Sequence, residues 1–173
     1  MESLGRGAYA HVTASLDSSG VATKRYFQTS DGLMSALCDI ETIRWLQAAH
    51  VTGAMTCTSF TPVPPTLVMP RAQTNLQSWL HEQPTPPSAK QQLSIARQVA
   101  ACLAHAHALG TVHRDVKLEN ILVVQDDPMH VCLTDWGLAR TVPLDGDVAR
   151  PSHCPHRSIS PCCGTETTMA PEQ

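Results

Sequence analysis

The sequence predicts an α+β fold arranged in two lobes, and the order of its segments is the main reason. Strand-like segments dominate residues 3–27, a long helical segment occupies 89–109, and short strand-like segments follow it before an irregular stretch. The chain has 173 residues, the length of a single domain. Hydrophobic residues make up 42% and aromatic residues only 4%, so the expected core is aliphatic and rich in alanine.

Charge and hydropathy narrow the function classes. The formal net charge of −3 argues against a domain that binds nucleic acid through electrostatics. No apolar run approaches the roughly 20 residues of a membrane-spanning helix, and the opening "MESLGRGAYA" lacks the basic and apolar regions of a signal sequence. We therefore expect an intracellular protein, cytoplasmic or nuclear, without a membrane or nucleic-acid partner. Its seven cysteines are expected to be reduced, with Cys102 and Cys132 in the core.

Residues 1–69 are predicted to form a sheet with one helix. Residues 3–27 predict two or three strands separated by turns. Residues 32–49 have helical apolar spacing, and "TLVMP" at 66–70 predicts a short buried strand that ends at Pro70. The apolar positions of the predicted helix are Leu33, Leu37, Ile40, Ile43 and Leu46.

Residues 70–88 are predicted to connect the two lobes. They begin as a hinge, continue as a short helix at 74–83, and end in "PTPPS" at 84–88. The three prolines of that last stretch predict a rigid linker, because each proline restricts its own backbone torsion.

Residues 89–173 are predicted to form the second lobe, which begins with the helix at 89–109. Ser88 can cap the start of this helix and Gly110 can end it. Its apolar stripe comprises Leu93, Ala96, Val99, Ala100, Leu103 and Ala106. Short strands are predicted at "TVH", "ILVV" and "HVCLTD", and 143–163 predicts a loop. The cluster "HCPHRSISPCC" within that loop fits no usual zinc-ligand spacing.

The stretch "VHRDVKLENILV", residues 112–123, carries the clearest chemical pattern. A His-Arg-Asp triplet ends at Asp115, Lys117 follows two positions later, and Asn120 lies five positions after Asp115. This stretch resembles the catalytic loop of protein kinases, H-R-D-L-x-x-x-N. A lysine two positions after the aspartate is the pattern of Ser/Thr kinases.

Two further motifs follow in the order that this family has. "DWGLAR" begins at Asp135 and is similar to D-F-G, with Trp136 in the position of the phenylalanine. "APE" at 170–172 is similar to the A-P-E triplet of the same family. The chain thus resembles the eukaryotic-type Ser/Thr protein kinases over nearly its whole length. The stretches "ETIRWL" and "LVMPRAQTNLQSWL" also resemble the Ser/Thr kinases of herpesviruses.

The resemblance extends to the nucleotide-binding part of the family. "LGRGAYAHV", which begins at Leu4, resembles the glycine-rich loop G-x-G-x-x-G-x-V: Gly5 and Gly7 match, and Ala10 replaces the third glycine. "VATK" resembles V-A-I-K and implies that Lys24 binds the α- and β-phosphates of ATP. Met69 would be the gatekeeper behind the adenine, and the backbone of Arg71 or Ala72 would meet its edge. The residues implied to enclose the purine are Val12, Ala22 and Leu122.

Catalytic roles follow from the same resemblance. Asp115 would accept or orient the proton of a substrate hydroxyl, and Lys117 would lie near the transferring phosphoryl group. Asn120 and Asp135 would hold Mg²⁺, and the other substrate would be a protein Ser or Thr. Lys24 needs a carboxylate partner from the helix at 32–49, and both Asp39 and Glu41 are candidates. We favour Glu41 for its residue type and reach, although Asp39 shares the helical phase of Ile43 and Leu46.

The final segment of the sequence raises two expectations. "GTETTMAPE" resembles the loop that positions the substrate, so Thr165 would support Asp115 and Lys117. Phosphorylation in the segment between D-W-G and A-P-E is expected at one or more of Ser152, Ser158, Ser160, Thr165 and Thr167. Because the sequence stops just after A-P-E, we expect an incomplete helical second lobe with residues 141–173 poorly ordered. A weakly active protein that binds nucleotide or a partner, or an inactive fragment, is the alternative to an active kinase.

Overall fold

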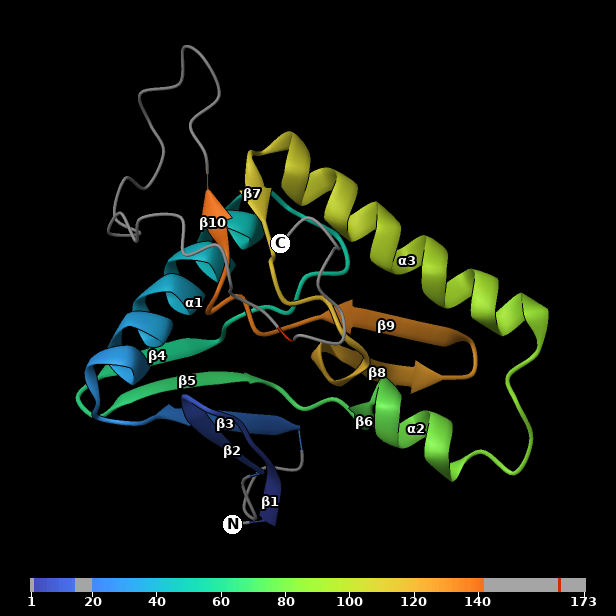
Figure 1. Ribbon diagram of the computed structural model, residues 1–173, viewed down its shortest axis with the longest axis horizontal. Helices are drawn as coiled ribbons and strands as arrows, with labels where there is room; N and C mark the ends of the chain where they lie inside the picture. The colour runs from blue at the N-terminus through green and yellow to red at the C-terminus, as the bar shows by residue number, and fades with distance from the viewer. Residues whose placement is uncertain (1, 15–19, 142–164, 166–173) are drawn as a thin grey trace.

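The computed structural model describes residues 2–14, 20–141 and 165. A twisted sheet with α1 beside it forms one part, and the hairpin of β8 and β9 with α2 and α3 forms the other (Figure 1). Strands and helices mix in both parts, which confirms the predicted α+β class. The predicted loop at 143–163 lies outside the described residues, as do the A-P-E triplet, the cysteine- and histidine-rich cluster and every candidate phosphorylation site except Thr165.

The larger sheet is antiparallel and has five strands in the order β1-β2-β3-β5-β4. The strands are β1 (Glu2–Arg6), β2 (Ala10–Ala14), β3 (Val21–Tyr26), β4 (Ser59–Pro62) and β5 (Pro65–Pro70). The expected two or three strands within 3–27 are thus three, and β4 was not predicted. β3 lies in the centre of the sheet, so its inward-facing side chains are covered on both sides by neighbouring strands.

Helix α1 (Ser30–Ala48) confirms the predicted helix but not its apolar face. Thr29 caps its start by accepting a hydrogen bond from the backbone N–H of Gly32 at 3.1 Å. Leu33 and Leu37 are 44% and 46% exposed, so the predicted stripe is wrong over its first two turns. The residues that the helix buries there are instead small or polar: Gly32, Ser35, Ala36 and Asp39. Small side chains let this end of α1 approach its neighbours closely.

A connecting segment pairs directly with the second part of the fold. The strand β6 (Thr74–Asn75) pairs with β8 (Ile121–Asp126), which pairs in turn with β9 (Met129–Leu133). Helix α2 (Leu76–Glu82) begins where Asn75 accepts the N–H of Ser78 at 2.9 Å. The predicted helix at 74–83 is therefore confirmed, but its first residues form a strand.

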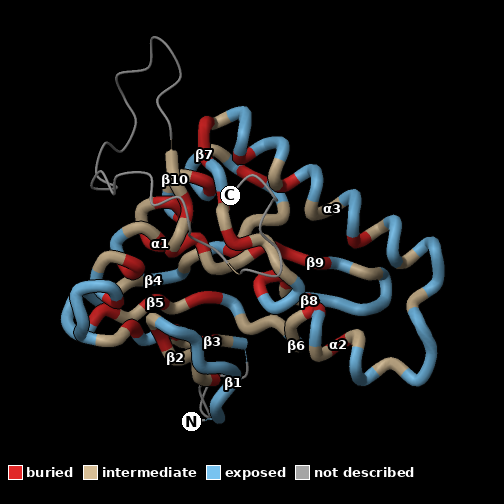
Figure 2. Tube along the Cα trace, in the orientation of Figure 1, coloured by how far each residue is buried: buried red, intermediate tan, exposed pale blue. Residues whose placement is uncertain are grey.

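Helix α3 (Ala89–Ala108) confirms the best-defined prediction. Ser88 and Gln91 form a reciprocal capping box, and Gly110 follows the helix with a φ of 72°. Its buried face is Ile95, Cys102 and Ala106, whereas Leu93 is 51% exposed. The outer side of α3 is accordingly exposed along its length (Figure 2), so the predicted stripe is correct only in part.

The core extends from the inner face of the large sheet to the β8–β9 hairpin. Cys102 and Cys132 are buried in it, as predicted from their apolar surroundings. The Gln98 side chain joins α3 to the edge of β9: its amide N–H donates to the Met129 carbonyl and its amide oxygen accepts the Val131 N–H. The strands β7 (Thr111–Val112) and β10 (Arg140–Thr141) form a separate, two-stranded antiparallel sheet. Among the helices of the described segments, none is both long and apolar enough to cross a membrane.

Candidate active site

The register of the large sheet places the predicted nucleotide-binding side chains on one face. Directly paired residues of neighbouring antiparallel strands share a face. Val12 pairs with Lys24, and Ala22 pairs with Met69. Since Ala22 and Lys24 are two positions apart on β3, all four side chains point to the same side of the sheet. Ala22, Lys24 and Met69 are buried and Val12 is partly buried.

The other predicted nucleotide-binding residues lie on β1, in the turn that follows it, in the connecting segment and on β8. Leu4 and Gly5 lie on the exposed edge strand β1, where Gly5 is opposite Val12. Gly7 forms the turn to β2 and donates its N–H to the Ala10 carbonyl at 2.9 Å. Ala72 lies between β5 and β6, and Leu122 is on β8, paired with Asn75 of β6. The structure therefore brings the connecting segment and β8 together beside the sheet.

Lys24 is the centre of a charge cluster in which Lys24 and Asp39 are buried. Its Nζ donates to Asp39 Oδ2 of α1 at 2.6 Å and to Asp135 Oδ1, beyond β9, at 2.8 Å. We call Lys24, Asp39 and Asp135, together with Tyr26, the Lys24 cluster. Burial is the largest influence on Lys24 and lowers its pKa, but the two carboxylates outweigh it and raise the pKa above its ordinary value. Lys24 is therefore a cation at neutral pH.

The partner of Lys24 is Asp39, so the preference for Glu41 was wrong. Asp39, Ile43 and Leu46 occupy the same helical face, and all three are buried against the sheet. Glu41 is two residues further along the helix, about 200° around its axis. Its Oε2 atom is buried without a hydrogen-bond partner in the described part of the chain. Asp39 is the partner because it lies on the face of α1 that packs against the sheet, where Lys24 is fixed. The longer side chain of Glu41 does not compensate for its position on a different face of the helix.

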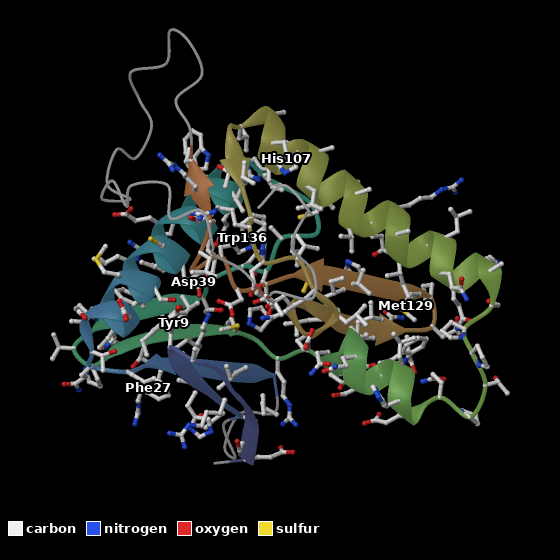
Figure 3. The ribbon with its side chains drawn as sticks, in the orientation of Figure 1. Tyr9, Phe27, Asp39, His107, Met129 and Trp136 are labelled. Atoms are coloured by element: carbon white, nitrogen blue, oxygen red, sulfur yellow. The ribbon has the colours of Figure 1, made fainter. Side chains whose placement is uncertain are left out.

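Asp39 also holds the segment that carries Asp135. The other carboxylate oxygen, Oδ1, accepts the backbone N–H of Trp136 at 2.8 Å. Figure 3 shows Asp39 and Trp136 in the centre of the molecule, between α1 and the strands. Gly137 follows, and a Cβ atom at that position would clash with Ser35 Oγ of α1. The absence of a side chain at Gly137 therefore allows this segment to pack against α1.

A second cluster is formed by Asp115, Lys117, Asn120 and Thr165, and we call it the Asp115 cluster. Lys117 Nζ lies 2.9 Å from Asp115 Oδ2, and the Thr165 hydroxyl donates to Asp115 Oδ1 at 2.7 Å. Lys117 also donates to Thr165 Oγ1 at 2.8 Å, which closes a triangle of contacts. Asn120 Nδ2 donates to the Asp115 carbonyl and to its Oδ2 atom, at 2.8 and 3.0 Å.

The pKa of Asp115 is lower than that of an ordinary aspartate. Burial is the largest single influence and raises it, but the hydrogen bonds from Lys117 and Thr165 and the Lys117 charge together outweigh that effect. Asp115 is therefore an ionised acceptor at neutral pH.

His113 connects the two clusters. Its Nε2–H donates to the Thr134 carbonyl at 2.9 Å, and its Nδ1 accepts the Asp115 backbone N–H at 3.2 Å. Its ring lies 4.4 Å from the Trp136 ring, centroid to centroid. Burial is the main reason that its pKa is lowered, against smaller opposing effects from Thr134 and nearby carboxylates. One ring nitrogen therefore donates and the other accepts, which is the pattern of a neutral imidazole.

Two non-glycine residues at this site have left-handed backbone conformations. Arg114 has a φ of 70° and Asp135 a φ of 64°. Such residues are uncommon and cost of order 1–3 kcal/mol each, and they are frequent at functional sites. Asp135 directs one carboxylate oxygen to Lys24 and keeps 44% of its side chain exposed.

Asn120 and Asp135 are brought together by a backbone hydrogen bond. The Thr134 N–H donates to the Asn120 carbonyl at 2.9 Å, so the turn at Leu118–Asn120 is tied to the residue that precedes Asp135. Asn120 directs its amide nitrogen at Asp115, which leaves its amide oxygen for another contact. Carboxylate and amide oxygens are the hard ligands that Mg²⁺ prefers, so these two residues fit the expected metal.

Sequence reasoning missed Tyr26. Its phenol donates to Asp39 Oδ2 at 2.6 Å and its ring is buried. The available signal was its position two residues after Lys24 on a strand, which places both side chains on one face.

A protein-family model matches the chain along its whole length, and individual relatives match parts of it. The family model described as "Protein kinase domain" matches residues 1–173. The serine/threonine-protein kinase US3 of human herpesvirus 1 (strain 17) is 32% identical over 123 residues, which cover 71% of this chain and 22% of that protein. The US3 kinase of human herpesvirus 2 (strain HG52) is 32% identical over 90 residues, 52% of this chain and 16% of that protein. The serine/threonine-protein kinase zyg-8 of Caenorhabditis elegans is 43% identical over 83 residues, 44% of this chain and 9% of that protein.

The chain spans less than a quarter of the length of these curated relatives. All three relatives carry the description of serine/threonine-protein kinases, and two of them are viral. The similarity to herpesvirus kinases agrees with the resemblance seen in the hinge and α1 sequences.

Proposed function

Because this chain belongs to the protein kinase family, we propose that it transfers the γ-phosphoryl group of ATP to a Ser or Thr hydroxyl of a protein substrate. The observation that carries the proposal is the simultaneous pairing of Lys24 with Asp39 and Asp135, at 2.6 and 2.8 Å. It joins α1, the central strand and the segment after β9 in one charge network. Such a network places a cation at the inner face of the sheet, where a nucleotide phosphate would need it.

Asp115 is proposed to orient the attacking hydroxyl and to accept its proton. Its lowered pKa keeps it ionised, and the contacts from Thr165 and Asn120 restrict its orientation. Lys117 is proposed to bind the transferring phosphoryl group, since it is a cation next to Asp115 and 23% of its side chain is exposed. These roles are mainly positioning and electrostatic, as expected for phosphoryl transfer.

Asn120 and Asp135 are the residues proposed to hold Mg²⁺. When bound, the ion would neutralise negative charge on the phosphates. Lys24 would bind the α- and β-phosphates. Asp39 would keep its amine in place, in the role that the sequence had suggested for Glu41.

The proposed nucleotide-binding surface is the face of the sheet that carries Lys24. Glycines at the start of the chain let the backbone approach the phosphates, and a Cβ built at Gly5 would meet no atom within 4 Å. The residues proposed to bind ATP in addition to Lys24 are Leu4, Gly5, Gly7, Val12, Ala22, Met69, Ala72 and Leu122. Because the reaction uses ATP, we also propose an intracellular location, in the cytoplasm or the nucleus.

Two measurements on the same protein test the proposed function. We expect Mg-ATP to raise the melting temperature, and we expect phosphate transfer from labelled ATP to a Ser/Thr-containing protein. Asp115→Asn should keep the thermal shift and lower the transfer rate about 10²–10⁴-fold, the range for losing a general base. Thermal stabilisation without transfer by the wild type would favour a nucleotide-binding protein over an enzyme. The absence of both would contradict the proposal.

A further inference from the structure

Tyr26 contacts both members of the Lys24–Asp39 ion pair. Side chains two positions apart on a strand share a face, so β3 directs Lys24 and Tyr26 to the same side of the sheet. The Tyr26 hydroxyl donates to Asp39 Oδ2 at 2.6 Å, the same oxygen that accepts Lys24 Nζ at 2.6 Å. Lys24 Nζ also lies 5.1 Å from the centroid of the Tyr26 ring, within cation–π range.

The Asp39 carboxylate is held by donors from two directions. Lys24 and Tyr26 approach Oδ2 from the sheet, and the Trp136 N–H approaches Oδ1 from the segment after β9. An aspartate has only two side-chain torsions, so three donors on its two oxygens determine both. Asp39 is 1% exposed, so bulk water cannot replace a donor that is lost.

Tyr26 is suited to this contact throughout the neutral pH range. Burial, followed by the Asp39 charge and hydrogen bond, raises the pKa of the Tyr26 phenol above its ordinary value. The phenol therefore stays protonated and donates to the carboxylate that also pairs with Lys24. Hydrogen bonds of this kind are shorter and stronger than those between neutral groups.

We propose that Tyr26 is a positioning residue for ATP binding: it orients Asp39, and through Asp39 it holds the Lys24 amine where the nucleotide phosphates bind. The inference rests on the proposed function. It identifies a residue that the sequence motifs do not include and assigns its hydroxyl, rather than its ring, the functional part.

The test is Tyr26→Phe, which removes the hydroxyl and keeps the ring. We expect the Kd for Mg-ATP, measured by calorimetry, to rise about tenfold, the effect of one charge-assisted hydrogen bond of typical strength. The KM for ATP should rise by the same factor, with the KM for the protein substrate unchanged. A purely structural loss would instead lower the folded fraction and reduce kcat without changing either KM.

Two further variants isolate the route of the effect. In a Lys24→Met background, Tyr26→Phe should change the Kd less than about twofold, because the residue that Tyr26 positions is gone. Thr111→Val is the matched control for losing a buried hydroxyl: Thr111 is fully buried and its hydroxyl lies 3.1 Å from that of Thr141. It should leave the Kd for Mg-ATP within about twofold of wild type.

Each outcome bears on one claim. An unchanged Kd in Tyr26→Phe, with wild-type binding intact, would overturn the inference and leave the proposed function standing. A tenfold effect that persists in the Lys24→Met background would also overturn it, because Tyr26 would then act without Lys24. No Mg-ATP binding by the wild type would overturn the proposed function itself, and the inference with it.

Discussion

The Lys24 cluster and the Asp115 cluster are each built around a lysine–aspartate pair, yet the lysine of the second pair is the more exposed. The Lys24 and Asp39 side chains are 10% and 1% exposed, whereas those of Lys117 and Asp115 are 23% and 9% exposed. The two N–O distances are similar, at 2.6 and 2.9 Å. The first pair joins elements of the fold, and the second joins residues within one loop and Thr165.

This difference predicts that substitutions in the two clusters will have different effects on the stability of the fold and on the rate of phosphate transfer. A buried charge that loses its partner is strongly destabilising, because the remaining charge has no water to solvate it. Lys117, at 23% exposure, can be hydrated when its partner is removed, so losing a partner costs less stability in the Asp115 cluster. We therefore expect substitutions in the Lys24 cluster to affect folding and nucleotide binding, and substitutions in the Asp115 cluster to affect mainly the rate of transfer.

The largest effect on stability is expected for Asp39→Asn. This change leaves buried Lys24 with Asp135 as its remaining carboxylate and should lower the free energy of unfolding by about 2 kcal/mol, the typical contribution of a hydrogen bond to a charged group. Urea denaturation measures the change. Glu41→Gln is the matched control on the same helix, and it should be neutral or slightly stabilising because Glu41 Oε2 is buried with no hydrogen-bond partner among the described residues. Equal losses in the two variants would contradict the assignment of Asp39.

A smaller and purely kinetic effect is expected for Thr165→Val. The valine removes the donor to Asp115 Oδ1 and the acceptor for Lys117, so Asp115 loses part of its orientation and its pKa rises. We expect the rate of phosphate transfer to fall about tenfold, the effect of one charge-assisted hydrogen bond. Thr165→Ser keeps the hydroxyl and should retain most of the rate. If both variants lose the same activity, the hydroxyl is not what matters.

The smallest effect is a pH dependence of stability from His113, which lies between the two clusters. Its pKa is lowered in the folded state, so below about pH 6.5 the unfolded chain binds a proton that the folded chain does not. Stability should therefore fall as the pH falls below that value and level off above it.

Thermal or urea unfolding between pH 5 and 8 measures this slope. His113→Gln should be less stable overall but should lack the slope in this range. His107→Gln, at an exposed position of α3, should keep the wild-type slope. A slope that survives in His113→Gln would show that another group is responsible.

Local signals made some elements predictable. The ends of α3 follow from Ser88, Gln91 and Gly110, because caps and glycine stops act over a few neighbouring residues. The apolar face of α1 was less predictable, since two helical phases are compatible with its sequence. Burial of Asp39 selects the phase that exposes Leu33 and Leu37, and that choice depends on the sheet beside it.

Short strands were harder to predict than helices. β4, β6 and β10 contain between two and four residues, and each exists only through its partner strand. Pairing of this kind depends on residues distant in the sequence, which propensity and periodicity do not report.

The sequence alone identified the charged residues Lys24, Asp115, Lys117 and Asp135, and the amide of Asn120, from the spacing of their motifs. Only the tertiary structure decided how they pair. Lys24 pairs with Asp39, which lies 15 positions later in the sequence, and with Asp135, which lies 111 positions later. The Tyr26 phenol donates to the same Asp39 carboxylate. The physical reason is that a motif is read from residues close together in the sequence. An ion pair depends instead on the distance between two side chains and on their burial, and both are set by the packing of the helix against the sheet.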